Sequence, residues 1–383
     1  MNPQPPTWDA AVIGAGVAGG VASAMLAARG WRVLLVEKSP WPREKVCGGC
    51  LTANAARVLS ELGIPLPGDR TRAIQKVFWH AGGSTLSMPI PGEIGILRSD
   101  LDAAIVSEAV RRGCEFLSGA TAWVLPASRE DEFREISLQT GRESRIVRAR
   151  VVLACDGIGG TSLGKIAWAK WQIARNSRIG VAGTWHGADR VMKPGEIHMH
   201  VGKAGYVGLV SFNENCVHLA AALDPAECRR AGGPGEIIRR ILTDERRPID
   251  PHWQFPRLRG TGPLTRRRRQ LAGHRLLVAG DACGYVEPFT GEGMAWAAIG
   301  AREAVNLLPE PRARWPGDLT KQWKRRHDDL IARKQVWCRA MRPMMRYPRL
   351  GPLVIGAVNA MPALGTWLAM RISQPRACEA FSS

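Results

Sequence analysis

The N-terminal part of the chain alternates between apolar runs and glycine-rich breaks. Residues 8–13 are almost wholly apolar, which is typical of a strand buried on both faces. Residues 17–29 are rich in alanine and end at Gly30, a residue that commonly terminates a helix, and residues 32–37 return to an apolar run. The pattern predicts a strand, a helix and a second strand.

The next part of the chain mixes helical and strand patterns. Ser99 and Asp100 are good N-cap residues before the apolar spacing of a helix that Gly113 ends. A further helix is predicted at 53–62, a hairpin at 74–79 and 84–88, and strands at 135–139 and 148–154.

The middle of the chain, about 178–259, alternates apolar and polar residues over short runs such as 197–201 and 217–221. This period is typical of a sheet that lines a pocket. His198 and His200 would lie on one side of their strand, and we expect two polar residues on a solvated face rather than pocket residues.

The last third begins with a predicted buried strand at 275–280 and a helix from near Glu292 to residue 307. Residues 309–316 are a proline-rich linker, and 319–341 form a strongly basic helical pattern. Residues 350–370 carry no charge, which leaves a membrane span, peripheral membrane contact and helices packed on the protein all open.

These elements predict an α/β (α+β) fold. A Rossmann-like nucleotide-binding lobe with inserted strands would occupy residues 1–177 and resume at 263–308. A β-sheet substrate lobe would occupy 178–262, and a basic and apolar helical region would occupy 309–383.

Composition narrows the class of protein. The net charge is +19, but the basic residues cluster without a nucleic-acid motif and only 6% of residues are aromatic, so no nucleic-acid partner is expected. Nine cysteines form an odd set and the N-terminus has no export signal, which favours the cytoplasm.

The glycines of the first turn indicate a dinucleotide site. Gly14 permits a tight turn, Gly16 lets the backbone approach a pyrophosphate, and Gly19 allows close helix packing. Glu37, at the end of the second strand, is placed to accept ribose hydroxyls, which argues against a 2′-phosphate.

Two motifs further along the chain favour FAD over NAD. Asp156-Gly157 follows one buried strand, and Gly280-Asp281 follows another. An acid at such a turn can hold ribityl hydroxyls, and the amides of residues 291–294 at a helix start can stabilise negative charge on a reduced flavin.

With these motifs in order, the sequence resembles the FAD-dependent oxidoreductase superfamily of para-hydroxybenzoate hydroxylase-type monooxygenases, geranylgeranyl reductases and flavin-dependent halogenases, over about residues 10–307. The resemblance implies that Arg98 contacts FAD and that residues 43–49 pass close to the flavin. The purely structural alternatives are that Arg98 forms a surface ion pair and that Asp156 only shapes a turn. The full cofactor-binding set that we expect is Gly14, Gly16, Gly19, Glu37, Lys38, Arg43, Lys45, Gly48, Arg98, Asp156, Gly157, Gly280, Asp281, Pro288, Gly291, Glu292, Gly293 and Met294.

Catalytic candidates are fewer. Cys47 is favoured as a pocket residue beside the flavin. Cys47 and Cys50 also form a CxxC motif, which could make a redox disulfide. No metal site is expected, because further ligands at suitable spacing are lacking. Tyr206 is a candidate pocket hydroxyl, but its segment lacks the tryptophan typical of prenyl reductases.

The predicted function is an FAD-dependent oxidoreductase, first a monooxygenase that hydroxylates a phenolic or polyketide-like hydrophobic compound. The alternative is a flavin-dependent C=C reductase acting on a prenyl or polyene lipid, and a non-catalytic lipid carrier is the third hypothesis. No second dinucleotide loop follows the first, so the reductant is transient NAD(P)H or an external electron donor. Peripheral membrane contact through the C-terminal region would suit a lipophilic substrate.

Overall fold

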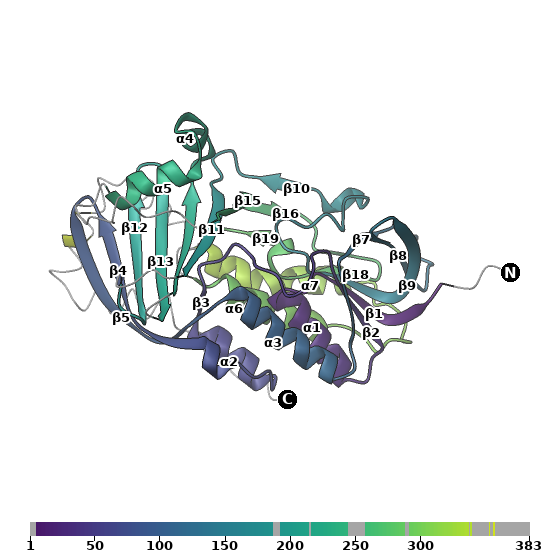
Figure 1. Ribbon diagram of the computed structural model, residues 1–383. Helices are drawn as coiled ribbons and strands as arrows, with labels where there is room; N and C mark the ends of the chain where they lie inside the picture. The colour runs from purple at the N-terminus through teal and green to yellow at the C-terminus, as the bar shows by residue number, and fades with distance from the viewer. Residues whose placement is uncertain are drawn as a thin grey trace.

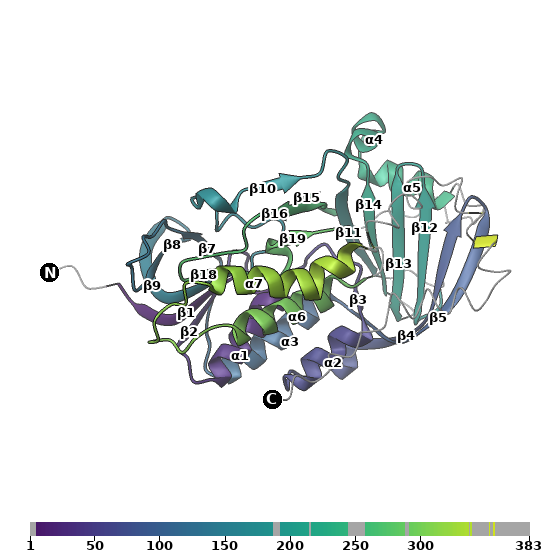
Figure 2. The same cartoon turned by 180° about the vertical axis from the view of Figure 1, so that it is seen from behind.

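Two eight-stranded sheets and a small three-stranded sheet form the protein (Figure 1). The computed structural model describes residues 5–186, 192–213, 216–243, 257–287 and 291–336, together with 338, 352, 355 and 356. The strands of the first sheet lie at one end of the molecule and those of the second at the other (Figures 1 and 2).

The first sheet has a parallel centre. In spatial order its strands are β17 (Ala272–Gly273), β18 (Leu276–Val278), β9 (Glu143–Ala154), β1 (Thr7–Ile13), β2 (Val33–Glu37) and β6 (Glu115–Ser118). From β18 to β6 every neighbouring pair is parallel. The antiparallel strands β7 (Ala120–Val124) and β8 (Arg134–Thr140) extend it beside β9. Because the strands are parallel, their carboxyl ends meet at one edge.

Three helices pack beside this sheet. They are α1 (Val17–Ala28), α3 (Arg98–Arg111) and α6 (Gly293–Asn306), with α1 in contact with the other two. Helix α2 (Ala53–Glu61) packs on α6. Helix α3 begins at Arg98 with Leu97 as its N-cap, so the predicted capping by Ser99 or Asp100 is wrong; the Asp100 carboxylate instead accepts from Arg70.

The second sheet is mainly antiparallel. Its order is β15 (Arg259–Pro263), β11 (Ile179–His186), β14 (Cys216–Leu223), β13 (Gly205–Asn213), β12 (Glu196–Gly202), β4 (Thr71–Ala81), β5 (Ser84–Ile96) and β3 (Cys50–Leu51). The parallel pair β12 and β4 joins the strands of the middle of the chain to the early hairpin. That hairpin is present but longer than predicted.

The two faces of the second sheet have different neighbours. Ile197 and Met199 of β12 face a cavity, whereas Val207 and Leu209 of β13 belong to the cluster that packs under α5 (Pro234–Thr243). Helix α4 (Pro225–Arg230) precedes α5 and begins with the Asp224 side chain as N-cap. The strands thus present one face to a ligand and the other to a helix.

Three histidines lie buried on the helix side of this sheet, so the expected solvated face is wrong. His198 and His200 stack with His80 of β4, and the Nε2 atom of His80 lies 3.0 Å from Nδ1 of His198. Nε2 of His198 lies 3.1 Å from a carboxylate oxygen of Glu196, an acceptor, so that nitrogen carries a proton. The near-parallel rings of His80 and His200, 18° apart, do not aim their in-plane lone pairs at one point. We therefore interpret the cluster as a hydrogen-bonded stack.

The C-terminal part of the described chain closes over the first sheet. Helix α7 (Leu319–His327) runs along α6 (Figure 2), and Trp323 is fully buried, with its indole N–H donating to the carbonyl of Val278. The predicted long basic helix is present from residue 319 to 336 in the described chain, with a π-helical turn (Asp328–Ala332) within it. The expected strand at 275–280 shrinks to β18, since Gly280–Ala282 form a 3-10 turn.

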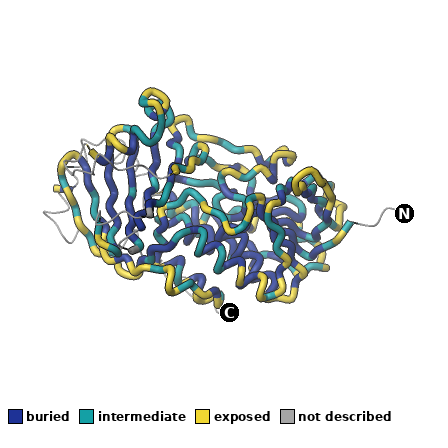
Figure 3. Tube along the Cα trace, in the orientation of Figure 1, coloured by how far each residue is buried: buried dark blue, intermediate teal, exposed yellow. Residues whose placement is uncertain are grey.

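The remaining strands are β10 (Trp171–Ile173), β16 (Arg266–Arg268) and β19 (Gly284–Tyr285), which form the small antiparallel sheet. Most buried residues lie in the strands of both large sheets and in α1 and α6 (Figure 3). Of the apolar segment 350–370, all but three residues lie outside the described residues. Among the helices that are described, none is long and apolar enough to cross a bilayer.

Candidate functional site

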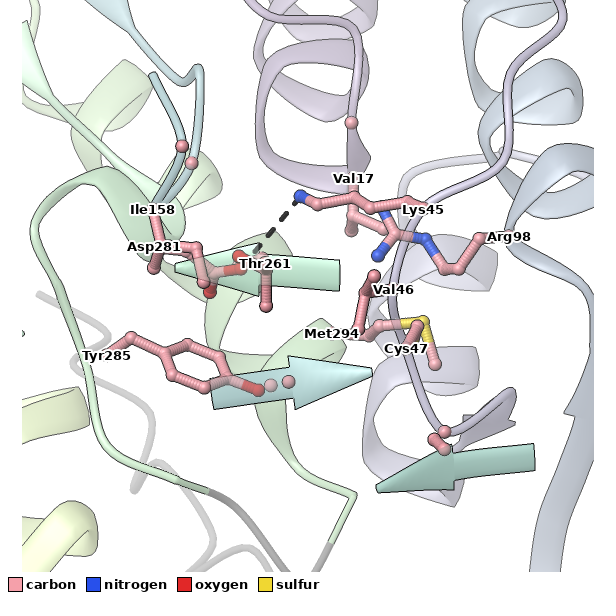
Figure 4. Close-up of a pocket in the computed structure, with 18 of the residues that line it drawn as sticks. Val17, Lys45, Val46, Cys47, Arg98, Ile158, Thr261, Asp281, Tyr285 and Met294 are labelled. Atoms are coloured by element: carbon pink, nitrogen blue, oxygen red, sulfur yellow. Dashed lines mark ion pairs between the residues drawn. The ribbon is translucent and has the colours of Figure 1, made fainter. Parts of the chain in front are cut away.

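A cavity of about 720 Å³ opens between the two large sheets, and Figure 4 shows part of its lining. One wall is the carboxyl edge of the parallel sheet: Gly14 follows β1, Glu37 ends β2, Asp156 follows β9 and Asp281 follows β18. Ligands bind at this edge in open α/β sheets. The motifs that lie far apart in the sequence therefore come together.

The glycine loop is packed too closely for side chains. Gly14 has a φ of +99°, and a Cβ atom there would lie 2.6 Å from the Cα atom of Asp156. A Cβ atom on Gly19 would lie 1.8 Å from the carbonyl oxygen of Gly14. Gly19 does not line the cavity; it lets the helix approach the loop, as its place in the motif predicts.

Glu37 holds the loop as well as facing the cavity. Its carboxylate accepts from the amides of Ala15 and Ser39, each at 3.0 Å, and pairs with Arg43 at 3.1 Å. Burial alone would raise the pKa of Glu37, but the Arg43 guanidinium and the two amides outweigh it and hold the pKa below its ordinary value. Glu37 is therefore an anionic acceptor at neutral pH.

Three cationic side chains converge over Gly16. A Cβ atom on Gly16 would lie 3.5 Å from Nη2 of Arg98, 3.6 Å from Nη2 of Arg43 and 3.7 Å from Nζ of Lys45. Arg98 is buried and pairs with the fully buried Asp102 at 2.8 Å, so it is not the surface ion pair that was the alternative. The cluster makes this end of the cavity a binding place for an anion.

Lys45 also reaches the opposite side of the cavity, where its Nζ atom lies 4.0 Å from Oδ2 of Asp281 (Figure 4). Burial and the neighbouring Arg98 lower the pKa of Lys45, and burial raises the pKa of Asp281 against the pull of Lys45. Both side chains keep part of their surface exposed in the cavity, and their 4.0 Å separation is longer than a direct hydrogen bond.

Asp156 both shapes a turn and faces the cavity. Its Oδ2 atom accepts from the amide of Ser162 at 2.9 Å, while its Oδ1 atom is buried and has no hydrogen-bond partner among the described residues. Gly157, with a φ of +71°, and Lys38, which donates to the carbonyl of Gly159, also line the cavity. An unsatisfied buried carboxylate oxygen at this wall calls for a donor from a ligand.

The turn before α6 forms the far part of the same wall. Gly291, Gly293 and Met294 line the cavity, whereas Glu292 is buried without lining it. Gly280 does not line it either; a Cβ atom there would lie 2.6 Å from the Cβ of Ala18, so this glycine lets the turn pack on α1. The predicted residue Pro288 lies outside the described residues.

Cys47, Gly48 and Cys50 line the cavity beside this turn. Both thiols are free, so the disulfide that the CxxC motif left open is not formed in this structure. The imidazole Nε2 of His218 lies 2.7 Å from the carbonyl oxygen of Cys47 and holds the segment. A Cβ atom on Gly291 would lie 3.9 Å from the carbonyl oxygen of Cys50, which places this segment against the turn before α6.

The second sheet forms another wall of the cavity, whose individual residues the sequence motifs did not predict. Its apolar lining includes Val77, Trp79, Met88, Ile197, Met199 and Val210. The candidate Tyr206 is buried and Tyr285, which the sequence did not suggest, is partly buried; both line the cavity, and desolvation raises the pKa of both well above that of a free tyrosine. The alternation of apolar and polar residues over 197–201 indicated this wall. No such alternation surrounds Glu93 or Tyr285, so the sequence did not reveal them.

Residues 7–310 match the FAD binding domain family. A menaquinone reductase of Mycobacterium tuberculosis is 26% identical over 369 residues, covering 90% of this chain and 85% of that protein. A probable electron transfer flavoprotein-quinone oxidoreductase of Escherichia coli is 32% identical over 155 residues, covering 39% of this chain and 36% of that one.

Among solved structures, the flavin-dependent brominase Bmp2 superposes with a TM-score of 0.79 at 18% identity, covering 96% of this chain and 93% of that one. A flavoprotein/dehydrogenase of Cytophaga hutchinsonii gives a TM-score of 0.76 at 17% identity, covering 95% and 92%. These likenesses concern the fold, and they confirm the predicted mixed α/β class.

Proposed function

The chain belongs to the FAD binding domain family and is an FAD-dependent oxidoreductase; from this premise we propose that it reduces a carbon–carbon double bond in a long apolar substrate of the prenyl-lipid class. The predictions of FAD as cofactor, of an enzyme, and of the superfamily are confirmed. The carrier without redox turnover is accordingly not proposed.

The residues of the cavity fit FAD. The three cations over Gly16 suit the pyrophosphate, the unsatisfied Oδ1 of Asp156 can accept from a hydroxyl, and the close-packed Gly14 leaves backbone exposed to the ligand. Arg43, Lys45 and Arg98 would hold the phosphates, with residues 291–294 beside the isoalloxazine. When bound, FAD supplies the hydride that a reduction needs.

The apolar wall of the second sheet is the observation that carries the proposal. Its residues lie on β4, β5, β12 and β13, and they line the same cavity as Met294 of α6. An apolar chain laid against Val77, Met88 and Met199 would bury its surface there and bring one double bond to the flavin. The protein's contribution is to orient that bond and exclude water.

The relatives support the same reading. Similarity to the mycobacterial menaquinone reductases spans both lobes and most of each chain, so it covers the substrate wall as well as the FAD site. A quinone that carries an unsaturated prenyl chain would lay that chain against this apolar wall. The segment around Tyr206 counts against this proposal, because it lacks the tryptophan typical of prenyl reductases.

The monooxygenase hypothesis remains the alternative. The feature that favours it is a pair of lining tyrosines, the buried Tyr206 and the partly buried Tyr285, whose hydroxyls could position a phenolic ring. Both readings require reduced flavin, and they differ in whether oxygen is consumed.

Anaerobic single turnover separates them. FAD-loaded protein is reduced with dithionite without oxygen, mixed with menaquinone, and then aerated before mass spectrometry. Aeration returns any quinol to the quinone, so a product that stays heavier by two hydrogens has a saturated double bond. We expect that product; a product that forms only with oxygen and gains one oxygen atom would instead establish the monooxygenase.

We further propose an external electron donor and peripheral contact with an anionic membrane. Similarity to a probable electron transfer flavoprotein-quinone oxidoreductase supports the donor. Exposed basic residues of α7, such as Lys321 and Arg325, support the contact.

A further inference from the structure

Glu93 is a buried carboxyl group in the cavity that neither the glycine loop nor the cationic cluster uses. It lies on β5 and lines the cavity, with 8% of its surface exposed. The thiol of Cys50 donates to its Oε2 atom at 3.4 Å. The backbone of Ala53 is a second hydrogen-bond partner, so the partners of Glu93 are neutral groups and not cations.

Glu93 lies at the flavin end of the cavity. Cys50 packs against the turn before α6, because a Cβ atom on Gly291 would lie 3.9 Å from the carbonyl oxygen of Cys50. Glu292 of the same turn is close enough to act electrostatically on Glu93. The carboxyl group thus lies beside the segment that would contact the isoalloxazine.

The other lining carboxylates are committed elsewhere. Glu37 pairs with Arg43, Glu44 with Arg259, and Asp281 faces Lys45. The remaining one, Asp156, accepts from the Ser162 amide at the opposite, nucleotide end. Within the described part of the chain, Glu93 is the lining carboxyl group at the flavin end that faces no cation.

We propose that Glu93 is the catalytic acid that protonates the substrate in the double-bond reduction, an inference that rests on the proposed function. One alkene carbon receives a hydride, whose two electrons come from reduced FAD, and the other carbon receives the proton of the Glu93 carboxyl group. The π bond breaks and two C–H bonds form. Solvent returns a proton to Glu93, and the external electron donor reduces FAD again.

The acidity of Glu93 suits this role. Burial, and to a smaller extent the nearby Glu292, raise its pKa to about 7, against the lowering effect of the Cys50 thiol. A general acid is most effective when its pKa is near the working pH, since it is then both protonated and able to release the proton. Tyr206 and Tyr285 hold their protons too tightly, because burial raises their pKa values well above the ordinary one.

The test compares wild type, Glu93→Gln, Glu93→Asp and Cys50→Ala in the anaerobic single-turnover assay with menaquinone across pH. For wild type we expect the rate of double-bond saturation to fall as the pH rises through about 7. Glu93→Gln should lose roughly a hundredfold or more in this rate, the usual scale of general acid catalysis, and also lose the pH dependence. Glu93→Asp should recover part of the rate.

Cys50→Ala gives a finer readout. Because the thiol lowers the pKa of Glu93, its removal should move the midpoint of the pH profile to higher pH. FAD content, reduction of the flavin by dithionite, and its reoxidation by oxygen should match wild type in every variant. The control is Glu143→Gln, an exposed residue at the start of β9 away from the cavity.

The two proposals fail differently. If wild type saturates no double bond, the reductase function fails and the role of Glu93 falls with it. If wild type saturates the substrate and Glu93→Gln does so at the same rate with the same pH profile, the reductase function stands and Glu93 is not the acid.

Discussion

Lys45 and Asp281 face each other across the cavity, with 4.0 Å between Nζ and Oδ2 (Figure 4). The two residues come from the loop after β2 and the turn after β18, so their approach depends on the whole parallel sheet. In the proposed FAD site, the carboxylate would accept from hydroxyls of FAD and Lys45 would approach its phosphates. We predict that Asp281→Ala removes most of the bound FAD, measured as flavin absorbance per protein after purification.

Asp281→Ala could lose FAD because it misfolds or because one contact with FAD is missing. Adding FAD to the purified variant distinguishes the two explanations. Asp281→Ala should keep the circular dichroism of wild type and bind FAD with at least tenfold weaker affinity, which corresponds to about 1.4 kcal/mol. The control variant is Asp69→Ala, whose side chain is largely exposed. Full flavin occupancy in Asp281→Ala would contradict the assignment.

Gly14→Val tests the glycine loop. The residue combines a φ of +99° with a Cβ position 2.6 Å from the Asp156 backbone, so a valine is both strained and in collision with the β9 turn. We expect it to lose bound FAD and to unfold at lower temperature. Gly317→Val is the matched control, because no atom lies within 4 Å of its Cβ position, and it should retain FAD and thermal midpoint.

The glycine loop and the strand-end acids were predictable because each lies in a local window that combines an apolar run with a turn residue. Asp156 and Asp281 could be found this way without knowledge of the sheet order. The histidine stack could not, because His80 and His198 are 118 residues apart and meet only through the parallel pairing of β4 with β12.

Glu93 shows the same limit at the site itself. Its context, Pro91-Gly92-Glu93, is typical of a polar turn, and nothing local indicates burial. The residue is buried because β3 pairs with β5 and brings Cys50 against it. Periodicity can reveal which residues of a strand share a face, but not which distant segment covers that face.

Arg98 and Asp102 form a buried ion pair whose removal can be measured as stability. Asp102 is fully buried and accepts from Arg98 and Arg43, so Asp102→Ala leaves two guanidinium groups without their shared partner. We expect a loss of about 3–5 kcal/mol in the free energy of unfolding by denaturant. Glu135→Ala breaks the exposed pair with Arg148 and should cost only about 0–1 kcal/mol. Equal costs for the two variants would contradict the burial argument.

The raised pKa of Glu93 predicts a pH dependence of stability that does not depend on any substrate. Its folded pKa of about 7 lies above the ordinary value of 4.5, so the neutral carboxyl stabilises the fold fully below about pH 4.5. That contribution is lost as the pH rises through about 7. Relative to Glu93→Gln, wild type should therefore lose free energy of unfolding across this range and change little above it. A constant difference across the same range would mean that Glu93 titrates normally.

The proposed membrane contact is best tested by neutralising basic residues of α7 and not by removing the C-terminal region. A cut after Pro316 would also remove Trp323, which is fully buried and hydrogen-bonded to Val278, so loss of binding would be confounded with unfolding. Lys321 and Arg325 are exposed on α7.

Replacing both with glutamine should weaken cosedimentation with phosphatidylglycerol vesicles, since each basic residue near an anionic surface contributes about 1 kcal/mol, and high salt should weaken wild type in the same way. A Lys203→Gln, Arg145→Gln variant removes the same charge elsewhere on the exposed surface and should bind like wild type. Equal binding by the two double variants would assign the attraction to the net charge of +19 and not to α7.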